Sequence, residues 1–213
     1  MDNQVQELTS SITTSLTIPS TTMRHRIPIS MLQANGNMWN HSLIFTMMHG
    51  DHLNPNHVMR TIKIKWKVVD ACDIVRAGHN RFVCRFSNDN NHERVEEQQP
   101  WVAMGCLVLM EPFTTGMIAA NATFERLPLW MSFRGEHMQT KTVRMIGSVA
   151  GIVTTVLPVR IIPRNAEGFR ARVNINVNEP LLQGYPFNTL SNGDVWISFK
   201  YNNLPGLSCT SCL

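Results

Sequence analysis

Cys209 and Cys212 form a C-x2-C pair, a spacing at which two thiolates can bind zinc or take part in redox exchange. A structural zinc ion needs four ligands, so this pair fills half of the coordination sphere. A redox pair of the thioredoxin type opens a helix, and only Leu213 follows Cys212 in the sequence. The pair therefore predicts an incomplete metal site. We expect no cofactor in this chain unless other groups supply the missing zinc ligands.

Basic side chains are concentrated in two segments. Residues 55–86 hold seven basic and two acidic residues, and residues 121–174 hold eight basic and three acidic ones. Residues 87–99 carry a net charge of −3. Such segments are typical of polyanion contact and also of ordinary solvated faces, and on charge alone the second interpretation is the commoner one.

Three groups of cations are candidates for phosphate contacts. They are Arg81 and Arg85 on one predicted strand, Arg60, Lys63 and Lys67 on one predicted helix, and Lys141 and Arg144 on another. On the strand, Phe82 and Phe86 are predicted to point into the core, so the outward face lacks aromatic residues that stack on bases. Binding would then rest on phosphates and read little sequence.

The sequence offers little for catalysis. It contains no G-x-S-x-G elbow, no P-loop and no H-E-x-x-H zinc motif, so we expect no enzymatic activity. One predicted loop and the start of the next helix contain His49, Asp51, His52 and His57, and these side chains are possible ligands of a transition metal. A polar loop that caps the next helix is the favoured interpretation of these residues.

The elements that must position these residues follow from the hydrophobic pattern. Residues 41–48 and 106–113 predict buried strands, and residues 71–86 predict a hairpin. Residues 55–69 predict a helix that begins at Asn54-Pro55 and buries Val58, Ile62, Trp66 and Val69. Residues 89–98 predict a second helix. The order is βαββαβ, the ferredoxin-like plan of the RNA recognition motif.

A second, smaller unit follows. Residues 127–135 predict a strand, residues 140–151 a helix with Thr140 as N-cap, and three further strands follow up to residue 204. The fold class is therefore α+β, with a βαββαβ domain at 38–113 and a βαβββ unit at 124–204. A flexible Ser/Thr-rich arm precedes them at 1–37, and a truncated zinc-knuckle start follows at 205–213.

Composition limits the setting. No apolar run approaches the ~20 residues of a membrane span. No secretory signal is visible, and five scattered cysteines favour a reducing compartment. We therefore expect an intracellular protein of the nucleus or cytoplasm with no membrane partner.

Five segments together carry a family resemblance. They are "ERVEEQQPWVAMGCLVLMEP", "LPLWMSFRG", "RMIGSVAGIV", "RARVNINVNEPLLQG" and "WISFKYNNLPGLSCTSC". In this order the chain resembles, over residues 38–212, the plant domain-of-unknown-function 4283 family of LINE-type retroelement proteins. The resemblance implies an RNA-recognition-like fold, nucleic-acid binding and a C-x2-C-x4-H-x4-C zinc knuckle. Cys209 and Cys212 match its first two ligands.

Two classes of function follow from these patterns. The first is a non-catalytic retrotransposon-related protein that binds single-stranded RNA or DNA mainly through phosphate contacts. The alternative is a protein-interaction or structural domain that has lost nucleic-acid binding through truncation. Self-association is left open in both cases.

Overall fold

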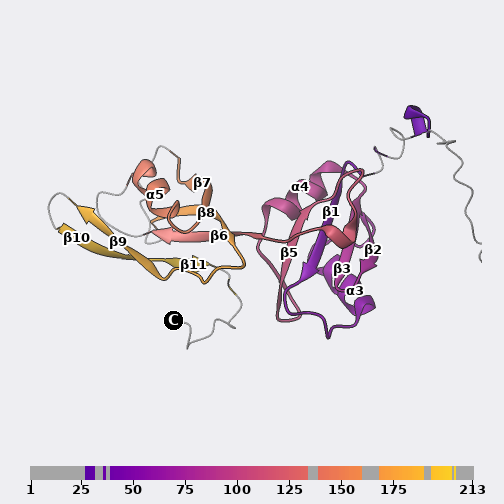
Figure 1. Cartoon of the computed structure of the whole chain (residues 1–213), viewed down its shortest axis with the longest axis horizontal. Coiled ribbons are helices and arrows are strands. Elements are labelled where there is room, and N and C mark those ends of the chain that lie inside the picture. The colour runs from indigo at the N-terminus through magenta and orange to yellow at the C-terminus, as the bar shows by residue number, and fades with distance from the viewer. Residues whose placement is uncertain are drawn as a thin grey trace, which may run out of the picture. The chain divides into compact units, whose positions relative to one another are not determined.

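The structure is a computed structural model that describes residues 27–31, 36, 39–133, 139–159, 168–189, 193–202 and 204. These residues form antiparallel sheets with few helices, which confirms the α+β class (Figure 1). The predicted arm at 1–37 lies mostly outside the described residues, and the predicted knuckle start at 205–213 lies wholly outside them. The predicted domain boundaries stay a prediction.

The first sheet has five strands in the order β2-β3-β1-β5-β4, and every neighbouring pair is antiparallel. Its elements are β1 (Ser42–Met47), α3 (Pro55–Lys65), β2 (Cys72–Gly78), β3 (Arg81–Phe86), α4 (Asp89–Glu97), β4 (Trp101–Ala103) and β5 (Cys106–Pro112). The predicted order of strands and helices is present, with the short strand β4 in addition.

Strand β4 was not predicted because its turn carries an unusual residue. Met104 and Gly105 both have positive φ, 53° and 77°, and they join β4 to β5 as a two-residue hairpin turn. Turns of this kind are usually recognised by Asn-Gly or Asp-Gly, because these residues adopt left-handed backbone most easily. Because methionine occupies the first position of this turn, the sequence does not indicate a hairpin here.

Helix α3 begins where the sequence predicts and ends earlier. The Asn54 side chain accepts hydrogen bonds from the backbone N–H groups of Asn56 and His57, at 3.0 and 3.4 Å, which confirms the predicted N-cap. At the other end Lys67 has a φ of 56°, and the Val68 N–H donates to the Lys63 carbonyl. This left-handed C-terminal motif stops the helix after Lys65.

The early stop changes one predicted core residue. Val69 is 56% exposed, so its predicted burial is wrong, whereas Val68 is buried. The physical reason is the chain reversal at Lys67, which turns Val68 back towards the core, as the residue after a left-handed cap commonly does.

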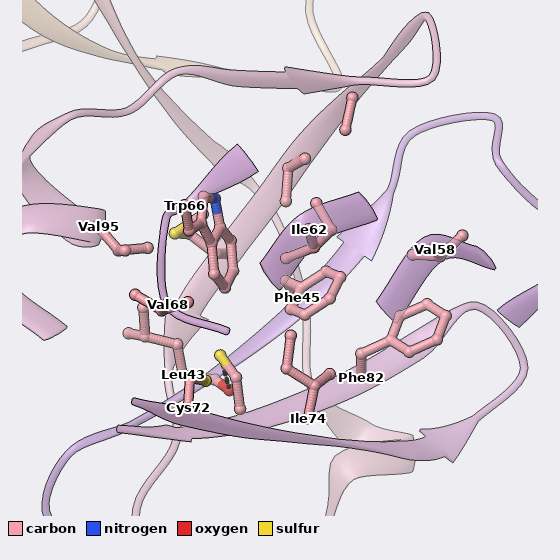
Figure 2. Packing of buried hydrophobic residues seen from close by; sticks show 14 of the residues in the cluster. Leu43, Phe45, Val58, Ile62, Trp66, Val68, Cys72, Ile74, Phe82 and Val95 are labelled. Atoms are coloured by element: carbon pink, nitrogen blue, oxygen red, sulfur yellow. Dashed lines mark hydrogen bonds between the residues drawn. The ribbon is translucent and has the colours of Figure 1, made fainter. Parts of the chain in front are cut away.

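The core of this sheet lies between its strands and both helices. Trp66 is fully buried, as predicted, and its ring lies 5.4 Å from that of Phe45 and 6.1 Å from that of Phe86. Figure 2 shows Val58, Ile62 and Trp66 pointing from the α3 segment onto Phe45 and the strands. Val95 of α4 packs into the same cluster.

The second sheet has four strands in the order β11-β6-β8-β7, and a two-stranded ribbon pairs β10 with β9. The elements are β6 (Arg126–Phe133), α5 (Thr140–Gly147), β7 (Ile152–Leu157), β8 (Phe169–Asn176), β9 (Gly184–Thr189), β10 (Gly193–Ser198) and β11 (Lys200–Asn202). Helix α5 packs Val143 and Ile146 onto one face, among Leu129, Met131 and Val173.

This unit differs from the predicted βαβββ order. Strand β9 was not predicted because Pro186 interrupts its pattern. Among the described residues the ribbon has two strands, so no further strand requires the missing proline N–H. The predicted last strand divides into β10 and β11 at Phe199, which is buried and donates its N–H to the Gln183 carbonyl at 2.6 Å. Thr140 is the first helical residue of α5 and not its N-cap, which is Gln139.

Candidate nucleic-acid interface

The face of the first sheet that points away from its helices is covered. Ile44 of β1 and Val83 of β3 point to this face, and their side chains are 0% and 2% exposed. They pack with Phe113 and Ala122 of the segment after β5, which holds a short 3-10 turn, η1 (Ala119–Asn121). The expectation that this face is open is therefore wrong, because a later segment of the chain lies across it.

Arg81 and Arg85 point to this covered face and already have partners there. The Arg81 guanidinium donates to the carbonyls of Ala119 and Ala122, at 3.2 and 2.6 Å, and lies over the Phe124 ring. Arg85 forms an ion pair with Asp73 at 2.7 Å and lies over Trp39. Both arginines thus hold the covering segment or the neighbouring strand in place. Their predicted role in binding stays a prediction.

The cations of α3 have a different environment. Arg60 and Lys67 are exposed and Lys63 is half-buried, and no hydrogen bond or ion pair joins these side chains to any other described residue. Arg60 and Lys63 lie three residues apart on α3 and share one side of the helix. Lys67 lies beyond the end of α3 with left-handed backbone, so helical spacing does not place it on that side, and the predicted helical face of three cations is wrong for Lys67. We call these three residues the α3 surface.

Two further cations lie in or beside α3. Lys65 is exposed in the last turn, and sequence reasoning did not select it because it lies on another side of the helix. Arg94 of α4 donates to the Trp66 carbonyl at 2.7 Å and ties the two helices together. Lysines in the last turn also complement the helix dipole, which is the structural alternative to a binding role.

The candidates on α5 lie apart from the α3 surface. Lys141 is exposed, and Arg144 is exposed but donates to the Val153 carbonyl of β7 at 3.0 Å. The structure therefore does not bring the seven predicted residues into one site. It divides them between a covered sheet face, one exposed helix surface and a second helix.

Sequence reasoning missed a further set of polar residues on the second sheet. Trp130 of β6 is half-buried on the face opposite α5, and the Arg170 guanidinium lies 5.7 Å from its ring centre. The alternation of Arg170 and Arg172 in "FRARVNIN" already placed both arginines on one face of a strand. The pairing of β8 with β6, which sets them beside a tryptophan, could not be read from the sequence.

The described residues show no metal centre. Cys209 and Cys212 lie outside them, so the predicted incomplete zinc site stays a prediction. Within the described part of the chain, no three His, Cys, Asp or Glu side chains are placed to hold a metal ion. Asp51 contacts His79 and Asn80 at 3.2 Å each. Burial raises the pKa of the Cys84 thiol, which disfavours the reactive thiolate form.

Comparison with known proteins bears on the first sheet. Residues 35–120 match the family model "Domain of unknown function (DUF4283)". This stretch is similar to the DUF4283 family. It contains every strand from β1 to β5, and the match supports the family resemblance for these residues. The DUF4283 model does not extend over the second sheet.

Solved structures and curated proteins were also compared with this chain. A solved structure described as "Sxl-lethal protein/RNA complex" is similar at a TM-score of 0.29 and 11% sequence identity, covering 64% of this chain and 83% of that chain. A search of curated proteins found no match. No helix among the described residues is long and apolar enough to cross a membrane.

Proposed function

We propose that this protein is a non-catalytic nucleic-acid-binding protein that holds a single strand mainly through phosphate contacts, and that the α3 surface makes these contacts. The observation that supports the proposal is the contrast between two basic groups. Arg81 and Arg85 are bonded to the protein itself, whereas the cations of the α3 surface have no protein partner among the described residues.

Phosphate binding suits what these side chains offer. Each cation that meets a phosphate releases condensed counterions, and this release provides binding that does not depend on sequence. The α3 surface contains no aromatic residue, so base stacking there is not part of the proposal. Specificity for a particular sequence is accordingly not expected from this surface.

The proposal also includes the plan of the first sheet, a family relation, a zinc site and a cellular location. We infer an RNA-recognition-like, ferredoxin-like plan for the first sheet from its strand order and helix positions. A relation to plant LINE-type retroelements, a zinc knuckle that begins at Cys209 and Cys212, and a place in the nucleus or cytoplasm belong to the same proposal. They rest on the resemblance alone.

The alternative function is a protein-interaction or structural domain. The covered sheet face favours it, because the surface that RNA recognition motifs use for binding is filled here by the chain's own residues. Binding of the full chain to a short unstructured single-stranded RNA, measured by anisotropy across a salt series, separates the two. Affinity that falls steeply with salt supports the proposal, and no binding at low salt supports the alternative.

A further inference from the structure

The second sheet has one face that α5 does not cover. Along β6 and β8 the side chains alternate between the buried core and this other face. We call it the Trp130 face. It consists of Arg126, Pro128, Trp130 and Ser132 on β6, Arg170, Arg172, Asn174 and Asn176 on β8, and Lys200 and Asn202 on β11.

The strands of the Trp130 face carry charges of one sign, and Glu96 and Glu97 of α4 lie near Arg172 at its edge. Strands β6, β7, β8 and β11 contain no aspartate or glutamate. All four of their cations, Arg126, Arg170, Arg172 and Lys200, fall at positions of this face. Like charges on neighbouring strands repel each other, so their gathering disfavours the isolated sheet and favours an anionic ligand.

The strand register puts an aromatic ring among these cations. Lys200, Ser132 and Arg170 lie opposite one another across β11, β6 and β8. The next row contains Asn202, Trp130 and Arg172. Neighbouring strands are about 5 Å apart, so Lys200 and Arg170 stand on either side of the strand that carries Trp130. Arg170 also leans over the Trp130 ring, at 5.7 Å from its centre.

The four cations differ in their surroundings. Arg172 donates to the Glu96 carbonyl at 3.0 Å, and burial lowers its pKa. Arg126 lies near Glu111, whose pKa is raised by burial and lowered in part by this arginine. Arg170 and Lys200 are both exposed, and the strand register sets them on either side of the strand that carries Trp130. Asn202 donates to the Ser132 hydroxyl at 2.9 Å, which fixes both polar groups next to Trp130.

We propose that the Trp130 face is a second binding surface for a single-stranded nucleic acid. Trp130, together with the Arg170 guanidinium, stacks on a base, while Arg170 and Lys200 contact the flanking phosphates. Stacking on an aromatic ring beside cations is how proteins hold unpaired bases, and a duplex hides its base faces. A protein partner would need acidic side chains to match the cations. This inference rests on the proposed function and adds base stacking to it.

The test compares variants of the full chain with labelled single-stranded RNA, single-stranded DNA and duplex DNA, by anisotropy across a salt series. Trp130→Ala should weaken single-strand binding by about fivefold or more, because one stacked base is worth at least about 1 kcal/mol. The salt slope should stay as it is, since stacking involves no charge. Trp130→Phe should keep most of the affinity. Lys200→Gln should lower the slope by about 0.7.

Trp196→Ala is the matched control. Trp196 is 60% exposed on β10, outside the Trp130 face, so its removal should leave binding unchanged. Wild-type affinity in Trp130→Ala, or a loss of stability that Trp130→Phe does not restore, overturns the inference. If α3 variants weaken binding and Trp130→Ala does not, this inference fails and the proposed function stands. If the full chain binds no single strand at all, both fail.

Discussion

Trp66 shows how one residue can be both central to the core and imperfectly accommodated. It is fully buried among Phe45, Phe86 and Trp101, yet its indole N–H has no hydrogen-bond partner among the described residues. A buried donor without a partner costs about 1–3 kcal/mol. The ring therefore stabilises the fold through packing, against an opposing polar cost.

The first prediction follows from this balance. Trp66→Ala should lower the free energy of unfolding by about 3–5 kcal/mol, as large-to-small core substitutions do. Trp66→Phe should cost clearly less than Trp66→Ala, because it removes the unpaired donor, keeps an aromatic ring and leaves a smaller cavity. Urea unfolding of both variants measures the difference. Equal costs would show that the indole N–H has a partner or that the site cannot repack.

Tyr201 provides a prediction on pH. Burial raises its pKa to about 12, and its hydroxyl donates to the Leu182 carbonyl at 2.8 Å. The unfolded state ionises near its ordinary pKa of about 10, so stability is complete below that pH and is lost as the pH rises towards about 12. Unfolding free energies of the wild type and of Tyr201→Phe should converge across this range. A constant difference would contradict the assigned burial.

At the scale of the element, the C-terminus of α3 changes the setting of Lys67, which the sequence predicts within the helix and the structure places after its end. Lys67 adopts left-handed backbone, with a φ of 56°, at a position where glycine is the usual choice. A non-glycine residue in this conformation is strained by roughly 1 kcal/mol or more. A lysine at this position is costly for folding, which is consistent with its place in the α3 surface.

Lys67→Gly should therefore separate stability from function. We expect it to raise the free energy of unfolding by about 0.5–1 kcal/mol, because glycine adopts this backbone without strain. It should also weaken nucleic-acid binding, since it removes one cation of the α3 surface. Lys63→Gly is the matched control. It should lower stability by about 0.5–1 kcal/mol, because Lys63 is helical. If Lys67→Gly and Lys63→Gly change the free energy of unfolding in the same direction, the left-handed conformation of Lys67 is contradicted.

The same elements show what the sequence could and could not predict. Local patterns were sufficient for β1, α3, the hairpin of β2 and β3, α4 and β5, because caps and alternating residues announce them. Strands β4 and β9 were not predicted, because Met104 is atypical in a hairpin turn and Pro186 is atypical within a strand. For the site, the shared side of Arg60 and Lys63 follows from helical spacing, whereas Lys67 lies beyond the end of the helix. The burial of the face that carries Arg81 does not, because a segment distant in sequence covers it.

At the scale of the whole molecule, the covered sheet face is the main departure from the expected plan. The segment after β5 supplies Phe113, Ala119 and Ala122 to that face, and Arg81 fastens it with two hydrogen bonds. Under the proposed function, nucleic acid would bind to other surfaces. The α3 surface offers cations without protein partners among the described residues, and the Trp130 face offers cations around an aromatic ring.

The central claim is that the α3 surface meets phosphates. The measurement that tests it most directly is the salt dependence of single-stranded RNA binding by the full chain, in wild type and in Lys63→Ala/Lys67→Ala. We predict that the log–log slope falls by about 1.4 in the double variant, because each lost phosphate contact removes about 0.7. Arg76→Ala should leave the slope unchanged, because Arg76 is an exposed cation on β2 that donates to the nearby Gly78 carbonyl and lies outside the α3 surface. An unchanged slope in the double variant, with binding intact, would contradict the claim.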